Sequence, residues 1–265
     1  MTVIGLLTDF GYKDGYVGVM KGVMLAICPQ AQLVDISHEV SPQGILEGVF
    51  VLRQAFSYFP PGAIFLTVID PGVGTERKAL AARVGQFAFV GPDNGVITPL
   101  LRWGQEKHLE AEIVILDQPR YWLPDVSTCF HGRDIFAPVA AYLAAGVPLG
   151  SMGSPTREVI LLDLPAASPQ PGGFQASVLF TDHFGNVVTN LQASEVQVGE
   201  SLTVQIAGRR IHGMVRTFGE RPPGTLIALA DSSGYLAISL VQGNAARYLG
   251  VSAGDPVIIY LRQPG

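Results

Sequence analysis

Most of the side chains that could do chemistry lie in three short segments: residues 8–14 (TDFGYKD), 70–77 (DPGVGTER) and 130–134 (FHGRD). In the first, Asp9 follows an apolar run over residues 3–7 that predicts a buried strand. A carboxylate at the end of such a strand can accept both hydrogen bonds of a ribose diol. In the second segment, Asp70 and Arg77 stand in a Pro-Gly loop that could present both side chains into a cleft.

Each segment also has an ordinary structural interpretation. Asp14 could cap the helix that is expected after it. Residues 70–77 could form a simple Pro-Gly turn. His131 could sit in a polar loop at the start of a helix that Asp134 caps. Three such loops in one half of the chain favour a functional site over coincidence.

Several familiar sites are missing from the sequence. No GxGxxG follows the first apolar run, and neither GxxxxGK[ST] nor GxSxG occurs, so dinucleotide, P-loop and serine-hydrolase motifs are excluded. The five histidines are far apart, and Cys28 and Cys129 have no second cysteine nearby. A zinc ribbon and a CxxC redox site are therefore excluded. We expect no metal and no cofactor.

The elements that must position these segments alternate between strands and helices. Strands are expected over residues 3–7, 33–36, 63–69, 79–84 and 87–90, and helices over residues 14–28 and after a cap at Ser41. Such alternation predicts crossover connections and a largely parallel sheet in an α/β domain. Ligands of these sheets bind beyond the carboxyl ends of the strands, where segments 8–14 and 70–77 begin.

The character of the chain changes after about residue 160. A linker rich in proline and glycine is predicted over residues 163–174, between an α/β domain over 1–162 and a β-rich domain over 175–265. The second domain is expected to be a smaller barrel, with short alternating runs at 176–180, 201–206, 225–230, 235–240 and 256–261.

Composition narrows the class of ligand and the compartment. The net charge is −5 and no basic run occurs, so nucleic acid is not expected as a partner. A small ligand, and by the sign of the charge a cationic one, fits better. With no apolar stretch near the ~20 residues that span a bilayer, no signal peptide and no disulfide framework, we expect a soluble cytoplasmic protein.

Six motifs in order resemble those of the adenosine-forming S-adenosylmethionine hydrolases, relatives of the S-adenosylmethionine-dependent fluorinase and chlorinase. They are LTDFG at 7–11, DPGVG at 70–74 with Arg77, GPDNG at 91–95, FHGRD at 130–134, DHFGNV at 182–187 and SSGYL at 232–236. The resemblance implies an N-terminal α/β domain and a C-terminal β-barrel domain. It also implies a homotrimer whose sites lie between the N-terminal domain of one subunit and the C-terminal domain of the next.

The resemblance also assigns roles to single residues. It implies that Asp70, Arg77 and His131 bind and activate water. It also implies that Asp9 binds ribose and that Asp14 and Ser232 bind the methionine end of the substrate. For adenine it implies contacts from Phe184 and Asn186, with Phe218 near the same ring.

The resemblance leaves the nucleophile to be decided. The halogenating relatives have an aromatic residue in place of Asp70, and a carboxylate there would repel a halide, so we expect water to attack the ribose 5′ carbon and give adenosine and methionine. The alternatives are a halogenase of the same fold and a protein that binds S-adenosylmethionine or adenosine without turnover. Which of the three water-handling residues takes the proton stays open.

Overall fold

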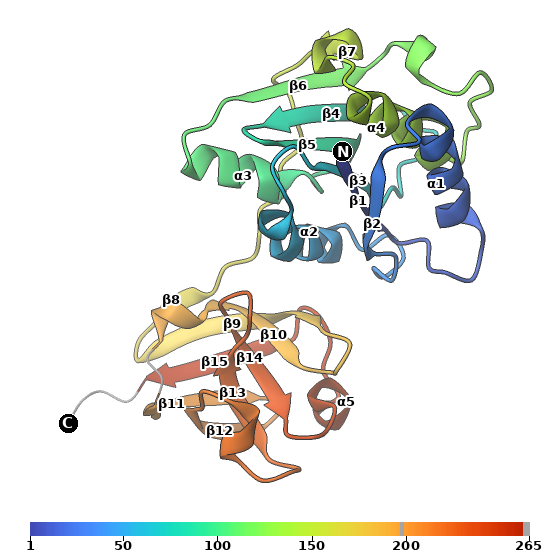
Figure 1. Ribbon diagram of the computed structural model, residues 1–265. Helices are drawn as coiled ribbons and strands as arrows, with labels where there is room; N and C mark the ends of the chain where they lie inside the picture. The colour runs from blue at the N-terminus through green and yellow to red at the C-terminus, as the bar shows by residue number, and fades with distance from the viewer. Residues whose placement is uncertain (197–198, 262–265) are drawn as a thin grey trace. The chain divides into compact units, whose positions relative to one another are not determined.

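The computed structural model describes residues 1–196 and 199–261 (Figure 1). The chain divides into two compact units, Met1–Asp163 and Leu164–Gly265. The first is α/β and the second is a β barrel-like unit, so the predicted fold class is confirmed. The predicted linker contains a short strand, β8 (Ser168–Gln170), which pairs with the first long strand of the second unit. The predicted domain boundaries stay a prediction.

The first unit is built on a seven-stranded sheet in the order β2-β1-β3-β5-β4-β6-β7. Its strands are β1 (Val3–Thr8), β2 (Gln32–Ser37), β3 (Ile64–Val68), β4 (Ala79–Val84), β5 (Phe87–Pro92), β6 (Ala111–Leu116) and β7 (Gly153–Pro155). Strands β2, β1, β3 and β5 are parallel neighbours. The two-residue turn at Gly85 and Gln86 makes β4 antiparallel to β5, and β6 and β7 continue antiparallel.

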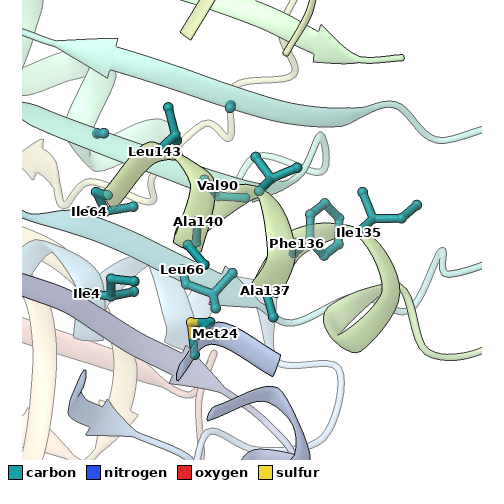
Figure 2. Packing of buried hydrophobic residues seen from close by; sticks show 14 of the residues in the cluster. Ile4, Met24, Ile64, Leu66, Val90, Ile135, Phe136, Ala137, Ala140 and Leu143 are labelled. Carbon is teal, nitrogen blue, oxygen red and sulfur yellow. The ribbon is translucent and has the colours of Figure 1, made fainter. Parts of the chain in front are cut away.

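Helices cover the two faces of this sheet. They are α1 (Tyr16–Ile27), α2 (Ile45–Ala55), α3 (Thr98–Glu106) and α4 (Ala137–Ala144). Figure 2 shows Ala137 and Ala140 of α4 over Leu66 and Val90 of the sheet, in a cluster of buried apolar side chains that also includes Met24 of α1. Side chains alternate along a strand, so the next residue to Leu66, Phe65, faces the other way and contacts the ring of Phe56.

Three predicted helix caps, Asp14, Ser41 and Asp134, are wrong. Helix α1 begins after Gly15, which makes no side-chain cap, so Asp14 is not its cap. Asp134 lies inside a π-helical turn, Gly132–Phe136, that runs directly into α4. The buried Asp134 accepts hydrogen bonds from the backbone and side chain of Ser127 instead. Helix α2 also begins later than Ser41 suggests, at Ile45.

The second unit is an antiparallel sheet in the order β12-β11-β15-β9-β10-β14-β13. Its strands beyond β8 are β9 (Gly173–Thr181), β10 (Val187–Gln192), β11 (Gly199–Ile206), β12 (Arg209–Met214), β13 (Leu226–Ala230), β14 (Tyr235–Leu240) and β15 (Pro256–Leu261), and its helix is α5 (Ala245–Leu249). The N–H of Val215, just after β12, donates to the carbonyl of Ala228 in β13, so the outer strands approach each other and the sheet nearly closes.

None of the helices within residues 1–196 and 199–261 combines the length and the apolarity needed to cross a membrane.

Candidate active site

The register of two parallel strands places two acidic side chains at the same edge of the first sheet. Thr8, the last residue of β1, pairs with Val68, the last residue of β3. Asp9 directly follows the first strand, and Asp70 follows the second after one further buried residue. Arg77 lies two residues before β4, which starts at this edge because it is antiparallel to β5. This edge is the usual ligand side of such a sheet.

Asp70, Arg77 and His131 form one hydrogen-bonded triad. Nε of Arg77 donates to both carboxylate oxygens of Asp70 at 2.9 and 3.1 Å, and Nη2 donates to Oδ2 at 2.5 Å. The same Nη2 lies 2.9 Å from Nδ1 of His131. The guanidinium also lies over the ring of Phe136, 5.1 Å from its centroid. Arg77 is therefore the group that joins the other two.

The contact with Arg77 fixes the protonation state of His131. A guanidinium only donates hydrogen bonds, so Nδ1 of His131 accepts and the ring proton lies on Nε2. Burial and the nearby charge of Arg77 lower the pKa of His131 below its ordinary value. His131 is therefore a neutral imidazole at physiological pH.

A cavity of about 730 Å³ opens beside the triad. Asp70 and His131 line it together with Asp9, whereas Arg77 lines a second hollow of about 410 Å³. The cavity wall also includes Ser127 and the exposed thiol of Cys129. The triad thus presents its carboxylate and imidazole to the cavity, and the guanidinium supports them from behind.

An aromatic cluster forms part of the cavity wall, and sequence reasoning gave it no role. Phe10, Tyr16 and Phe130 all line the cavity, and their ring centroids lie 5.2–6.0 Å apart in edge-to-face contacts. Arg133 lies over the ring of Phe130 at 5.3 Å. Phe10 and Phe130 belong to the sequence motifs, but an aromatic residue beside an apolar run is usually part of the core. The sequence signal that could have indicated a role in the site was their position directly beside Asp9 and His131.

Asp9 is held by the backbone of another loop. Its Oδ2 accepts the N–H of Gln43 at 2.7 Å, and Gln43 has the left-handed φ of 66° that is uncommon outside glycine. Both residues line the cavity. Asp9 therefore faces the place where a ligand would lie, as the sequence predicted, and its role toward ribose stays a prediction.

The remaining predicted residues lie elsewhere. Asp14 is exposed and is not part of the cavity wall. The others belong to three loops of the second unit: Phe184 and Asn186 between β9 and β10, Phe218 between β12 and β13, and Ser232 between β13 and β14. Asp182 shapes the first loop by accepting the N–H of Phe184 and both the N–H and the side-chain amide of Asn186. Their roles stay predictions.

The loop that carries His131 is held by Asp134. One oxygen of Asp134 accepts both the N–H and the hydroxyl of Ser127 at 2.8 Å, and the hydroxyl oxygen of Ser127 accepts the N–H of Phe130. Burial alone would raise the pKa of Asp134, but hydrogen bonds from Arg133 and Ser127 lower it overall. Asp134 is therefore an ionised anchor for the wall of the cavity.

Across residues 1–196 and 199–261, no three His, Cys, Asp or Glu side chains gather as they would around a metal ion.

Fold and cavity define an α/β protein with a small-ligand site at the carboxyl ends of its parallel strands. The family model described as the SAM hydroxide adenosyltransferase N-terminal domain matches residues 4–153, and that of the C-terminal domain matches residues 176–258. The chain belongs to the SAM hydroxide adenosyltransferase family, so the resemblance read from the motifs is confirmed.

Individual relatives agree with this assignment. Proteins named (R)-S-adenosyl-L-methionine hydrolase are 40% identical in Salinispora tropica, over 95% of each chain, and 39% identical in Thermus thermophilus, over 97% of this chain and 99% of that one. A protein named fluorinase from Actinoplanes sp. is 25% identical over 97% of each chain. A solved structure of an uncharacterized conserved protein from Thermotoga maritima has a TM-score of 0.89 and 36% identity, covering 97% of this chain and 99% of that one.

Proposed function

We propose that this protein hydrolyses S-adenosyl-L-methionine to adenosine and L-methionine. The observation that carries the proposal is the Asp70–Arg77–His131 triad, whose carboxylate and imidazole line a cavity at the ligand edge of the sheet. Relatives of 35–40% identity over nearly the whole chain, named as hydrolases of this substrate, support it.

In the proposed reaction a water molecule lies between Asp70 and His131 and attacks the ribose 5′ carbon opposite sulfur. The oxygen–carbon bond forms as the carbon–sulfur bond breaks, and sulfur keeps the electron pair as a neutral thioether, which needs no general acid. Nδ1 of His131 already accepts from Arg77, so the proton of the water is assigned to the carboxylate of Asp70. Positioned proton transfer of this kind contributes about 10²–10⁴-fold to a rate.

The charge of Asp70 alone does not exclude a halide from the cavity. Asp70 is bound in bidentate fashion by Arg77, so its charge is largely compensated and would repel an anion less than a free carboxylate. The preference for water is better supported by hydrogen bonding, because Asp70 offers an acceptor that water can use and a halide cannot.

The walls of the cavity suit a sulfonium substrate. Three aromatic rings and the carboxylates of Asp9 and Asp70 line the cavity together with Arg133, and aromatic rings and carboxylates favour an organic cation. We further propose that Asp9 binds the ribose diol, that Asp14 and Ser232 bind the methionine end, and that Phe184, Asn186 and Phe218 bind adenine. A homotrimer is part of this proposal, as the motif resemblance implies.

The proposal is tested by chromatography of the purified full-length protein incubated with S-adenosylmethionine in halide-free buffer prepared with ¹⁸O water. We expect methionine together with adenosine that carries ¹⁸O at the 5′ position. Asp70→Asn should greatly reduce adenosine formation, whereas Asp125→Asn, at an exposed carboxylate outside the cavity, should not.

The other outcomes separate the alternatives. Intact S-adenosylmethionine in halide-free buffer, followed by a 5′-halo-nucleoside when chloride or fluoride is added, would replace the hydrolase with a halogenase. Tight binding with no product in either buffer would leave a binding protein.

A further inference from the structure

One fully buried histidine takes no part in the proposed chemistry. His38 follows β2, and its side chain is 0% exposed. Buried polar side chains are costly unless they make specific contacts, so the partners of this residue indicate its purpose. Its side chain contacts Thr8, Tyr12 and Asp35, and its backbone carbonyl contacts Gly11.

His38 contacts the chain on both sides of Asp9. Its Nδ1 lies 2.7 Å from the hydroxyl oxygen of Thr8, the residue before Asp9. That hydroxyl oxygen also accepts the N–H of Phe10, the residue after Asp9, at 3.3 Å. The backbone carbonyl of His38 accepts the N–H of Gly11 at 2.7 Å. Thr8 is itself fully buried, so water cannot replace these bonds.

A surface carboxylate sets the direction of these hydrogen bonds. Nε2 of His38 lies 3.1 Å from Oδ1 of Asp35, although its N–H is not well aligned for a hydrogen bond. Burial would raise the pKa of Asp35, but Lys21, whose Nζ is 2.7 Å away, and His38 lower it below its ordinary value. A charged Asp35 favours a proton on Nε2, so Nδ1 accepts from the hydroxyl of Thr8 and the oxygen of Thr8 is free to accept from Phe10.

We propose that His38 is a positioning residue for the nucleoside end of the substrate: through Thr8 and the backbone of residues 10–11, it holds the carboxylate of Asp9 toward the cavity. The carboxylate is braced from the opposite loop by the N–H of Gln43. This inference rests on the proposed function, because it takes the ligand of Asp9 to be the ribose of S-adenosylmethionine and of adenosine.

The position of Asp9 determines which kinetic constant should respond. The ribose diol lies away from the bond that breaks, so Asp9 binds substrate and transition state about equally. Losing such a contact raises KM and leaves kcat nearly unchanged. His38 acts through Asp9, so it should show the same pattern, whereas general damage to the fold would lower kcat as well.

The test combines calorimetric binding of adenosine with steady-state kinetics on the full-length protein. His38→Ala and Thr8→Val should each weaken adenosine binding and raise KM on the order of ten-fold, the effect expected for a lost hydrogen bond to a binding group. His38→Asn keeps an acceptor near the place of Nδ1 and should restore most of the affinity. Thr8→Val keeps the buried volume, so it tests the contact even if His38→Ala does not fold.

A matched control and a double variant complete the experiment. Thr203 and His212 make the same kind of pair, at 3.1 Å, through a solvent-exposed hydrogen bond in the second unit, and Thr203→Val should change neither constant. In an Asp9→Asn background, His38→Ala should add no further loss of affinity. Wild-type affinity in His38→Ala and Thr8→Val, or fully additive losses with Asp9→Asn, would overturn the proposal. A wild-type protein that neither binds adenosine nor forms it would overturn the proposed function itself.

Discussion

Arg77 holds the triad together by a geometry that lysine cannot reproduce. Its planar group binds Asp70 through two nitrogens and reaches His131 with one of them. A lysine ammonium is a single charged point and cannot bridge both partners. We expect Arg77→Lys to lower kcat by about 10²-fold or more, within the range for positioned proton transfer, with little change in adenosine affinity. Arg83→Lys, at an exposed arginine of β4, is the control in the same kinetic and binding assays, and an active Arg77→Lys enzyme would contradict the role of the bridge.

The pKa of His131 makes a prediction about pH. Protonation would remove the acceptor that Arg77 uses and place a second cation beside the guanidinium, so only the neutral form fits the triad. Because burial and Arg77 lower the pKa of His131, the acid limb of kcat/KM should lie below about pH 6.5, the ordinary value for histidine. An acid limb above that value would show that another group controls it.

The same shift affects stability. In the unfolded chain His131 takes up its proton near its ordinary pKa, whereas the folded protein resists protonation until a lower pH. Below about pH 6.5 the unfolded state therefore binds more protons, and the contribution of His131 to the free energy of unfolding falls as pH decreases. Urea unfolding at several pH values, with His131→Asn for comparison, measures this contribution.

The aromatic cluster predicts discrimination by charge. S-adenosylhomocysteine is a neutral thioether of nearly the same shape as S-adenosylmethionine, so an aromatic wall should favour the sulfonium. Phe130→Leu should weaken binding of S-adenosylmethionine to an Asp70→Asn enzyme by about 0.5–2 kcal/mol and binding of the neutral analogue by less. Tyr58→Leu, at a ring that is 83% exposed, is the control. Equal losses of binding free energy for both ligands in calorimetry would mean that the aromatic wall recognises the shape of the ligand and not its charge.

At the scale of elements, the loop after β3 depends on one close approach. Gly74 has a φ of +75°, and a Cβ there would lie 2.2 Å from the carbonyl oxygen of Thr128, in the loop that leads to His131. Gly74→Ala should lower the free energy of unfolding by about 2–4 kcal/mol and misplace the triad. Gly62 has a similar φ of +85° but open space around it, so Gly62→Ala measures the backbone cost alone. Equal effects of the two variants in thermal unfolding would contradict the close approach.

Strands with continuous apolar runs were predictable from the sequence, whereas strands interrupted by polar residues were not. Strands such as β1 and β3 are buried on both faces and read as continuous apolar stretches. Strand β12 (RRIHGM) was missed because exposed polar residues interrupt its pattern, and the buried Thr189 and Asn190 disguised β10. The cap assigned to Asp134 is wrong because a π-helical turn precedes α4, so Asp134 lies inside a helical segment and not at its first position.

The site was predictable where it depends on strand ends. Asp9 and Asp70 follow buried strands, and the parallel arrangement alone brings their loops together. The contacts between Arg77 and His131 join residues 54 positions apart, and only tertiary packing determines them. The same holds for His38, whose partner Thr8 in β1 lies 30 positions earlier in the chain.

At the scale of the whole molecule, the cavity that holds the triad is lined entirely by residues of the first unit. The residues predicted to bind adenine all belong to the second unit. The predicted adenine contacts and the proposed water-handling triad thus come from different units of the chain, whereas the predicted ribose contact, Asp9, belongs to the same unit as the triad.

The exposed thiol of Cys129 on the cavity wall offers a way to measure whether the cavity is occupied. The chain has two cysteines, of which Cys28 is buried and Cys129 is exposed two residues before His131. A fluorescent maleimide should therefore label the folded protein at a single position without any engineering. Occupied cavities should be labelled more slowly than empty ones, so the rate of labelling at a given adenosine concentration would report the fraction of cavities that are occupied. Labelling at the same rate with and without adenosine would mean that the thiol lies outside the occupied volume.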